Sequence, residues 1–260
     1  MANVKLTLSY DGTNYCGFQS QIQEGQITIE SELKKAINMM DKNVNNIYCG
    51  GRTDSGVHAE GQVINFLTES STILEDNWIL GLNTTLPKDI RINNCEFVDN
   101  SFNARKSAIH REYQYNIIND KTISALMTRY NLFFPYFKLD KDILLGYLKE
   151  LLGENDYSAF SSINDKSPSK VRFLEYVDVK QDGPLFTIKI VGNSFLQHMI
   201  RIIIGTLFLL HRKNAPPSEM KRILLSKDRR EAGMTASPKG LILKKVHYDE
   251  RVYKKNYNLK

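Results

Sequence analysis

Hydrophobic and polar residues alternate in two stretches of the chain, which predicts half-buried β-strands. Val4, Leu6, Leu8 and Tyr10 alternate with polar residues, and a period of two is the spacing of one face of a strand. Residues 109–117 repeat this pattern with Tyr113 and its odd-numbered neighbours on one face. Further strands are predicted at residues 63–67, 90–98, 171–180, 185–191 and 241–246.

Other stretches carry apolar residues every three to four positions, the spacing of an amphipathic helix. Such helices are predicted at residues 29–40, 78–82, 143–151, 195–211 and 218–225. Gly153 is expected to cap the third of these helices at its C-terminus. Ser218 is expected to cap the last one at its N-terminus.

The order of these elements indicates the fold class. Strands cluster in each part of the chain instead of alternating strictly with helices, and the strand–helix–strand pattern occurs twice. This arrangement favours an α+β fold with largely antiparallel sheet.

Composition is that of an ordinary globular protein with a modest positive charge. The chain has 260 residues, 42% of them hydrophobic, 25% charged, and a net charge of +6, which suits a polyanionic partner without proving one. Three widely spaced cysteines and no Cys-x-x-Cys pair favour reduced thiols and no metal site. No secretory signal is predicted at the N-terminus, and the most apolar run, residues 202–210, is shorter than the roughly 20 residues of a membrane span. We therefore expect a cytoplasmic protein with no membrane segment, metal or redox cofactor.

The most informative segment is the glycine-rich stretch at residues 50–59, Gly-Gly-Arg-Thr-Asp-Ser-Gly-Val-His-Ala. It presents one carboxylate, Asp54, on a loop between strand-like segments, and such loops often carry catalytic groups. The residues alone also allow a simpler interpretation, a turn with a local ion pair between Arg52 and Asp54.

Several segments together resemble the TruA family of tRNA pseudouridine synthases. The segment at 51–63 is similar to the family signature, with Ser55 where alanine is usual, and the N-terminal segment at 9–19 has Phe18 where tryptophan is usual. Other similar segments lie, in the family's order, at residues 102–105, 110–115, 151–157, 195–201 and 234–241. The resemblance therefore covers nearly the whole chain.

This resemblance implies a fold, a reaction and partners. The fold would have two ferredoxin-like halves, residues 1–105 with the catalytic loop and residues 106–260, whose sheets form a central cleft. The enzyme would be a homodimer that needs no cofactor. It would convert uridine to pseudouridine in the anticodon stem-loop of tRNA, at about positions 38 to 40 of that RNA, after flipping the base out of its stack.

The resemblance also assigns catalytic roles. Asp54 matches the family's catalytic aspartate, which acts either by adding to C1′ of the ribose or by abstracting a ribose proton. Arg201 would pair with that aspartate. It lies in an apolar helix, where a guanidinium needs a partner or must reach solvent. Tyr113 would stack on the uracil and serve as a base in the late proton transfer, although a core tyrosine on a strand is the simpler interpretation.

Three further residues are candidate RNA contacts. Arg52 would help to hold the flipped base, and Arg105 and His58 would contact substrate. Each has a simpler interpretation, a solvated arginine or a hydrogen-bonded structural histidine. Residues 158–170 are rich in polar turn formers and predict a mobile loop at the RNA.

Three alternative functions stay open at the level of sequence. A related enzyme could modify another RNA, such as ribosomal RNA, with the same catalytic residues. An RNA-binding protein without catalysis would be favoured if Asp54, Tyr113 or Arg201 were replaced, and all three are present. A hydrolase that uses Asp54 and His58 is the remaining alternative.

Overall fold

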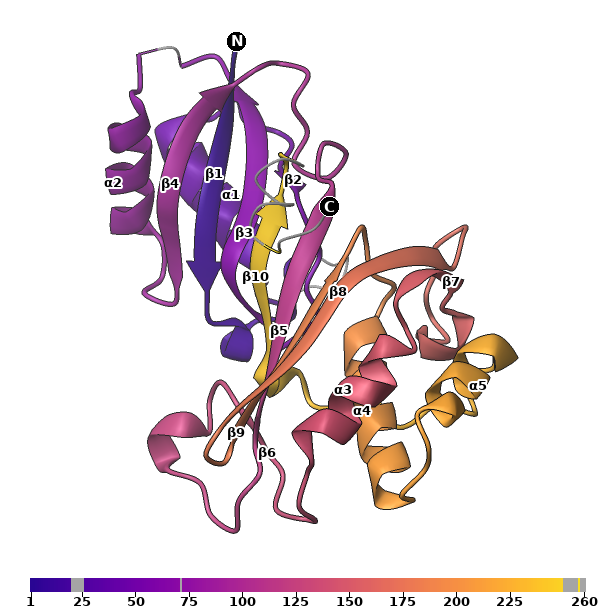
Figure 1. Ribbon diagram of the computed structural model, residues 1–260. Coiled ribbons are helices and arrows are strands. Elements are labelled where there is room, and N and C mark those ends of the chain that lie inside the picture. The colour runs from indigo at the N-terminus through magenta and orange to yellow at the C-terminus, as the bar shows by residue number, and fades with distance from the viewer. Residues whose placement is uncertain (20–25, 71, 250–256, 258–260) are drawn as a thin grey trace. The chain divides into compact units, whose positions relative to one another are not determined.

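A computed structural model of the protein describes residues 1–19, 26–70, 72–249 and 257 (Figure 1). The chain divides into two compact units, and each is described by itself. The first unit contains residues 1–109 and 242–249, and the second contains residues 110–241 and 257. This division differs from two continuous halves that meet at residue 105, because the last strand belongs to the first unit.

The first unit is built on the strand order β4-β1-β3-β10. These strands span Ile90–Val98 (β4), Ala2–Tyr10 (β1), His58–Thr68 (β3) and Leu241–His247 (β10). β1 runs antiparallel to β3 and β4, whereas β10 runs parallel to β3. The short strand β2 (Tyr48–Cys49) pairs with β3 just before the Asp54 loop.

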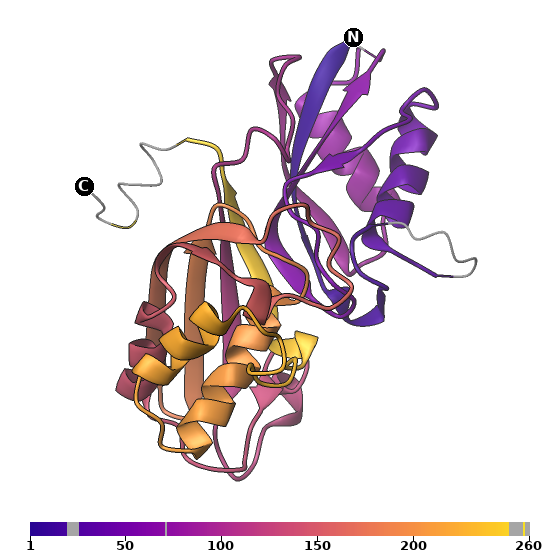
Figure 2. The ribbon, with the colours of Figure 1, turned by 90° about the vertical axis from the view of Figure 1, so that its right-hand side faces the viewer.

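Helices α1 (Ile29–Met40) and α2 (Glu75–Thr85) lie on one face of this sheet (Figures 1 and 2). The α1 helix begins with a capping box, in which the side chains of Thr28 and Ser31 each bond to the other's backbone N–H. The α2 helix buries Trp78 completely, and its ring packs edge-on against Phe66 of β3 at 5.3 Å. These contacts fix the sheet that positions the Asp54 loop.

The second unit is built on the antiparallel order β5-β9-β8-β7. These strands span His110–Ile118 (β5), Leu185–Gly192 (β9), Val171–Asp182 (β8) and Gly153–Asp156 (β7). The short strand β6 (Leu132–Phe133) runs parallel to the end of β5. The alternation predicted around Tyr113 is present except at Glu112: residues 111, 113, 115 and 117 of β5 are buried, residues 110, 114 and 116 are half-buried, and Glu112 is buried.

Helices α3 (Lys141–Lys149), α4 (Met199–Arg212) and α5 (Ser218–Ser226) contact one another and lie in front of the strands of this unit in Figure 2. Three predicted boundaries are wrong. The α3 helix ends at Lys149, and Gly153 instead opens β7 with a φ of 89°. Ser218 is the first residue of α5 and does not cap it with its side chain. The α4 helix begins at Met199 and not at residue 195, because His198 before it is left-handed, with a φ of 62°.

The predicted α+β class with largely antiparallel sheet is confirmed in both units. The predicted strands and helices are present, with the boundary changes given above. In the described part of the chain, no helix is both long and apolar enough to cross a membrane.

Candidate active site

Asp54 lies at a tight turn between β2 and β3 in the first unit. Its backbone oxygen accepts a hydrogen bond from Val57 N at 3.1 Å, and Gly56 between them has a φ of 75°, a conformation that glycine adopts without strain. The Asp54 side chain is partly exposed, and Thr53 before it is buried. The turn therefore presents the Asp54 carboxylate at the surface, directly after a buried residue.

The segment that follows β1 holds this turn from one side. Phe18 N donates to Thr53 O at 3.0 Å, and Ser55 Oγ donates to Tyr15 O at 3.1 Å. The Tyr10 hydroxyl lies 2.7 Å from Thr53 Oγ1, and burial raises the pKa of Tyr10 well above its usual value. The Tyr10 hydroxyl therefore stays protonated at neutral pH, as a hydrogen-bonding group and not a charge.

The buried amide of Gln62 holds the other side of the loop. Its Oε1 accepts from Gly51 N at 3.3 Å, and its Nε2 donates to Gly51 O at 2.6 Å and to the Tyr10 hydroxyl at 3.3 Å. Gln62 has no exposed surface, so loss of its partners would leave a buried polar group unsatisfied. This supporting role was not predicted, although Gln62 lies in a segment that resembles the TruA signature.

His58 lies at the start of β3 and is buried, with 3% of its surface exposed. Its Nδ1 lies 3.1 Å from both the backbone nitrogen of Gly12 and Oδ1 of Asp11. These contacts join the Asp54 loop to the turn after β1. The burial of His58 favours its interpretation as a structural histidine over that as an RNA contact.

Arg52 and Arg105 are both exposed residues of the first unit. Burial raises the pKa of the Cys49 thiol to about 11, while the positive charges of both arginines act to lower it. The two guanidinium groups therefore lie close enough to Cys49 to influence it. Both arginines are therefore exposed cations close to β2, the strand that leads into the Asp54 loop.

Tyr113 lies on β5 of the second unit, where it pairs with Ile190 of β9. Its side chain is largely buried, with 7% exposed. The ring packs edge-on against Phe195 at a centroid distance of 5.1 Å and an interplanar angle of 81°. An edge-on neighbour is a favourable aromatic arrangement that fixes the ring's orientation.

Arg201 lies in the first turn of α4 and is joined to the segment at 233–237. Its Nε donates to Ala236 O at 2.8 Å, and Ala236 N donates back to Arg201 O at 3.0 Å. The Tyr115 hydroxyl holds the same segment by donating to Ser237 O at 2.6 Å. Burial raises the pKa of Tyr115, and the positive charge of Arg201 opposes this shift. The Arg201 guanidinium therefore lies close enough to the Tyr115 hydroxyl to influence its pKa.

The candidate residues thus divide between the units. Asp54, Arg52, His58 and Arg105 belong to the first, and Tyr113 and Arg201 belong to the second. Within the described residues, no group of three or more His, Cys, Asp or Glu side chains has the geometry to hold a metal ion. The chemistry available is that of a held carboxylate, a tyrosine and several arginines.

Two comparisons with known proteins, against a family model and against individual sequences, agree on one family. The model of a family described as tRNA pseudouridine synthase matches residues 7–105 and 148–249. The chain is 37% identical over 245 residues to "tRNA pseudouridine synthase A" of Colwellia psychrerythraea, which covers 94% of this chain and 93% of the relative. It is 39% identical over 248 residues to the Bacillus pumilus protein of that name, which covers 95% and 99%. The Buchnera aphidicola protein of that name is 41% identical over 244 residues, covering 94% and 90%.

Proposed function

This chain belongs to the tRNA pseudouridine synthase family, and we propose that it isomerises uridine in the tRNA anticodon stem-loop with Asp54 as its catalytic carboxylate. The reaction breaks the bond between uracil N1 and ribose C1′, turns the base, and joins its C5 to C1′. C5 then loses its proton and N1, released from C1′, gains one, so that the product is an isomer of the substrate. The observation that carries the proposal is the Asp54 turn, held by Thr53, Gly51 and Ser55 through hydrogen bonds from both sides.

Asp54 acts on the ribose in its ionised form, because both addition to C1′ and proton abstraction need a carboxylate. A catalytic group works best when its surroundings hold it in place before the reaction. The bonds to Thr53, Gly51 and Ser55 fix the backbone on each side of Asp54. They support its assignment as the group that reacts with the ribose.

Tyr113 and Arg201 complete the proposed chemistry. Arg201 pairs with the ionised Asp54, and its bond to Ala236 O fixes the position of Nε. Tyr113 stacks on the uracil and accepts the C5 proton, with Phe195 holding its ring. Only the phenolate form of a tyrosine can accept a proton, so in this step the Tyr113 hydroxyl must first give up its own proton.

The remaining proposed residues act on RNA binding. Arg52 holds the flipped base, because a guanidinium can both hydrogen-bond and stack, and Arg105 contacts the RNA backbone. Both are exposed, as contact with a large substrate requires. His58 is better supported as a residue that positions the loop.

We further propose that the enzyme is a cytoplasmic homodimer and that one tRNA spans both subunits. The net charge of +6 supports a polyanionic partner. Sedimentation with and without tRNA measures the stoichiometry, and a monomer that binds one tRNA in each chain would contradict the dimer.

The decisive experiment is site-resolved pseudouridine mapping of total RNA from cells that lack this gene. Complementation with wild type is compared with Asp54→Ala, and with Asp142→Ala as a matched control on an exposed carboxylate. We expect wild type and Asp142→Ala to restore pseudouridine in the anticodon stem-loop and Asp54→Ala to restore none. If pseudouridine were lost only from ribosomal RNA, the substrate would be ribosomal RNA and not tRNA. If Asp54→Ala restored pseudouridine, Asp54 would not be the catalytic carboxylate.

A further inference from the structure

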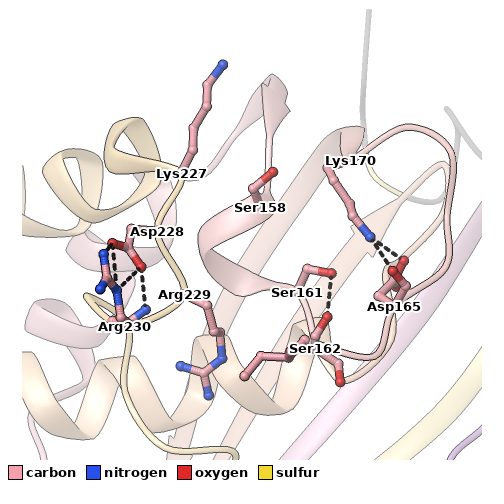
Figure 3. A pocket seen from close by; sticks show the side chains of 10 residues that line it. Ser158, Ser161, Ser162, Asp165, Lys170, Lys227, Asp228, Arg229 and Arg230 are labelled. Atoms are coloured by element: carbon pink, nitrogen blue, oxygen red, sulfur yellow. Dashed lines mark hydrogen bonds and ion pairs between the residues drawn. The ribbon is translucent and has the colours of Figure 1, made fainter.

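A pocket of about 470 Å³ opens on the second unit between the segment around Ser161 and the segment at residues 227–230 (Figure 3). Its lining is polar and rich in charge, with serine hydroxyls and the Lys170–Asp165 pair on one side and the charged side chains of residues 227–230 on the other. All of its lining residues belong to the second unit. None of them is among the proposed catalytic residues.

Most charges in this pocket are already paired. Lys170 contacts Asp165 at 2.6 Å, and Arg230 contacts Asp228 at 2.6 Å. Lys227 reaches Asp156, outside the lining, at 3.2 Å. These pairs cancel much of the charge of the lysines and of Arg230, so the character of the pocket depends on the remaining cation.

That remaining cation is Arg229. It donates to Ala232 O at 3.3 Å and to Thr235 Oγ1 at 3.4 Å, both long and neutral contacts, and no carboxylate of the described residues pairs with it. Burial lowers the pKa of Arg229, and no neighbouring charge offsets this shift. A partly buried guanidinium keeps its proton at any accessible pH, so an anion entering the pocket would supply the missing countercharge.

The serine side supplies hydrogen-bond donors of the right kind. The Ser161 hydroxyl has only a long contact, 3.4 Å, to Ser162 O, and the Ser162 hydroxyl accepts from Asn164 N at 3.3 Å. Each hydroxyl therefore keeps a proton that it can give to a stronger acceptor. A guanidinium opposite serine hydroxyls matches the oxygens of a phosphate group.

We propose that this pocket binds a backbone phosphate of the tRNA, with Arg229 as the principal ligand. The proposal rests on the proposed function for its choice of RNA, and it concerns affinity and not the chemical step. A cation that contacts one phosphate releases counterions from the RNA. The contact therefore makes the affinity for tRNA fall more steeply as the salt concentration rises.

Two variants test the site by independent routes. Arg229→Gln removes the cation, and Ile163→Glu adds a negative charge at a pocket residue that is 90% exposed. Ile163→Gln is the uncharged control for Ile163→Glu. Arg222→Gln removes an exposed arginine of α5 that pairs with Glu219 and Glu231 and lies outside the pocket.

The measurements are tRNA affinity from 50 to 300 mM KCl and the single-turnover rate of pseudouridine formation at saturating enzyme. For Arg229→Gln we expect binding about 5- to 10-fold weaker near 0.1 M salt, with the slope of log affinity against log salt shallower by about 1. Ile163→Glu should also weaken binding, Arg229→Lys should restore most of it, and both neutral controls should match wild type. The single-turnover rate should stay unchanged in every variant.

Three results would overturn the proposal. An unchanged salt slope in Arg229→Gln with normal binding by Ile163→Glu would leave Arg229 a structural residue. A lower single-turnover rate with normal affinity would place its effect on the segment that holds Arg201. If inorganic phosphate at constant ionic strength stabilised wild type but not Arg229→Gln while tRNA affinity was equal, the pocket would take a free anion instead. Failure of the proposed function is a separate observation, because it requires that wild type itself forms no pseudouridine in tRNA.

Discussion

Gly17 shows how closely the Asp54 loop depends on single residues beside it. Its φ is 90°, and a Cβ at this position would lie 2.8 Å from Thr53 O and 3.2 Å from Asp54 C. Both are backbone atoms, so no side chain can move aside to relieve the contact. The glycine lets the segment after β1 approach the back of the Asp54 turn.

We therefore expect Gly17→Ala to displace the Asp54 loop and to lower pseudouridine formation at least tenfold. Gly153→Ala is the matched control, because Gly153 has a φ of 89° and nothing lies within 4 Å of its added Cβ. Both variants should lose about 1–2 kcal/mol of unfolding free energy from the left-handed backbone, and Gly17→Ala about 1–3 kcal/mol more from the clash.

Denaturant unfolding and tritium release from labelled tRNA measure the two effects. Equal activity losses in the two variants would mean that general destabilisation, and not loop displacement, causes the loss. Normal activity of Gly17→Ala would show that the loop tolerates the shift.

At the scale of elements, α4 and the segment at 233–237 pack with their backbones in contact. A Cβ on Gly205 would lie 1.7 Å from Met234 O, and one on Gly233 would lie 2.4 Å from Gly205 O. Gly233 N also donates to the Thr206 hydroxyl at 2.9 Å. This close approach brings Ala236 within hydrogen-bonding distance of Arg201.

Gly205→Ala should push that segment away from α4 and separate Ala236 from Arg201. We expect about 1–3 kcal/mol less unfolding free energy and a lower single-turnover rate, with tRNA affinity close to that of wild type. Gly146→Ala in α3 is the control, since its added Cβ would only touch Pro217 Cγ at 3.4 Å and alanine favours a helix by about 1 kcal/mol. A normal rate in Gly205→Ala would argue that the Arg201–Ala236 bonds do not matter for chemistry.

The segment at 158–170, predicted to be a mobile loop at the RNA, has several hydrogen bonds that involve Asp165. Its carboxylate accepts from Lys170 Nζ at 2.6 Å, from Ser167 N at 2.7 Å and from Gln197 N at 2.6 Å. Burial by itself raises the pKa of Asp165, but the bonds from Lys170, Gln197 and Ser167 outweigh burial and hold the pKa well below its usual range. The ionised carboxylate therefore stabilises this loop.

A lowered pKa in the folded state gives stability above the pKa of the unfolded chain, about 3.9, which is lost as pH falls below that value. Asp165→Asn should thus lower the unfolding free energy at pH 7 by about 1–3 kcal/mol, and the gap to wild type should close as pH falls below about 4. Asp142→Asn, whose side chain is 86% exposed, should change it little. Thermal melts from pH 3 to 7 measure the gap, and a gap independent of pH would exclude the charge as its cause.

The sequence predicts those elements whose formation depends on residues close together in the chain. β1 and α1 follow from hydrophobic period, because each buries one face along a continuous stretch. The start of α4 does not, because Gln197 just before it is fixed by bonds to Ser162 and Asp165. The start of α4 cannot be predicted from the sequence, because periodicity carries no information about contacts between distant segments.

The same limit applies to the candidate site. Asp54 stands out in the sequence as a carboxylate in a glycine-rich loop, and a family resemblance singles out Tyr113 and Arg201. Gln62 and Ala236 do not stand out, because their roles come from hydrogen bonds with Gly51 and Arg201 that only the fold creates. Alanine in particular has no functional group that a sequence pattern could reveal.

At the scale of the whole molecule, the chain leaves the first unit at Ile109, forms the second, and returns to add β10 beside β3. β10 pairs with β3 at His58 and Ala59, directly after the Asp54 loop. The Tyr248 hydroxyl, just beyond β10, donates to Ala104 O at 2.8 Å. The Asp54 loop, in the N-terminal part of the sequence, thus lies beside a strand from residues 241–247.

This topology predicts that damage to β10 reaches the Asp54 loop. Leu243 is fully buried in the strand and Lys245 is exposed two residues later, so Leu243→Asp buries a charge whereas Lys245→Asp changes only the surface. We expect Leu243→Asp to cost about 3–5 kcal/mol of unfolding free energy, to speed amide exchange across β3 and residues 50–57, and to lower activity. Lys245→Asp should leave exchange and folding as in wild type. Exchange that rose only in the second unit would contradict the assignment of β10 to the first, because the strand would then stabilise the fold without holding the loop that carries Asp54.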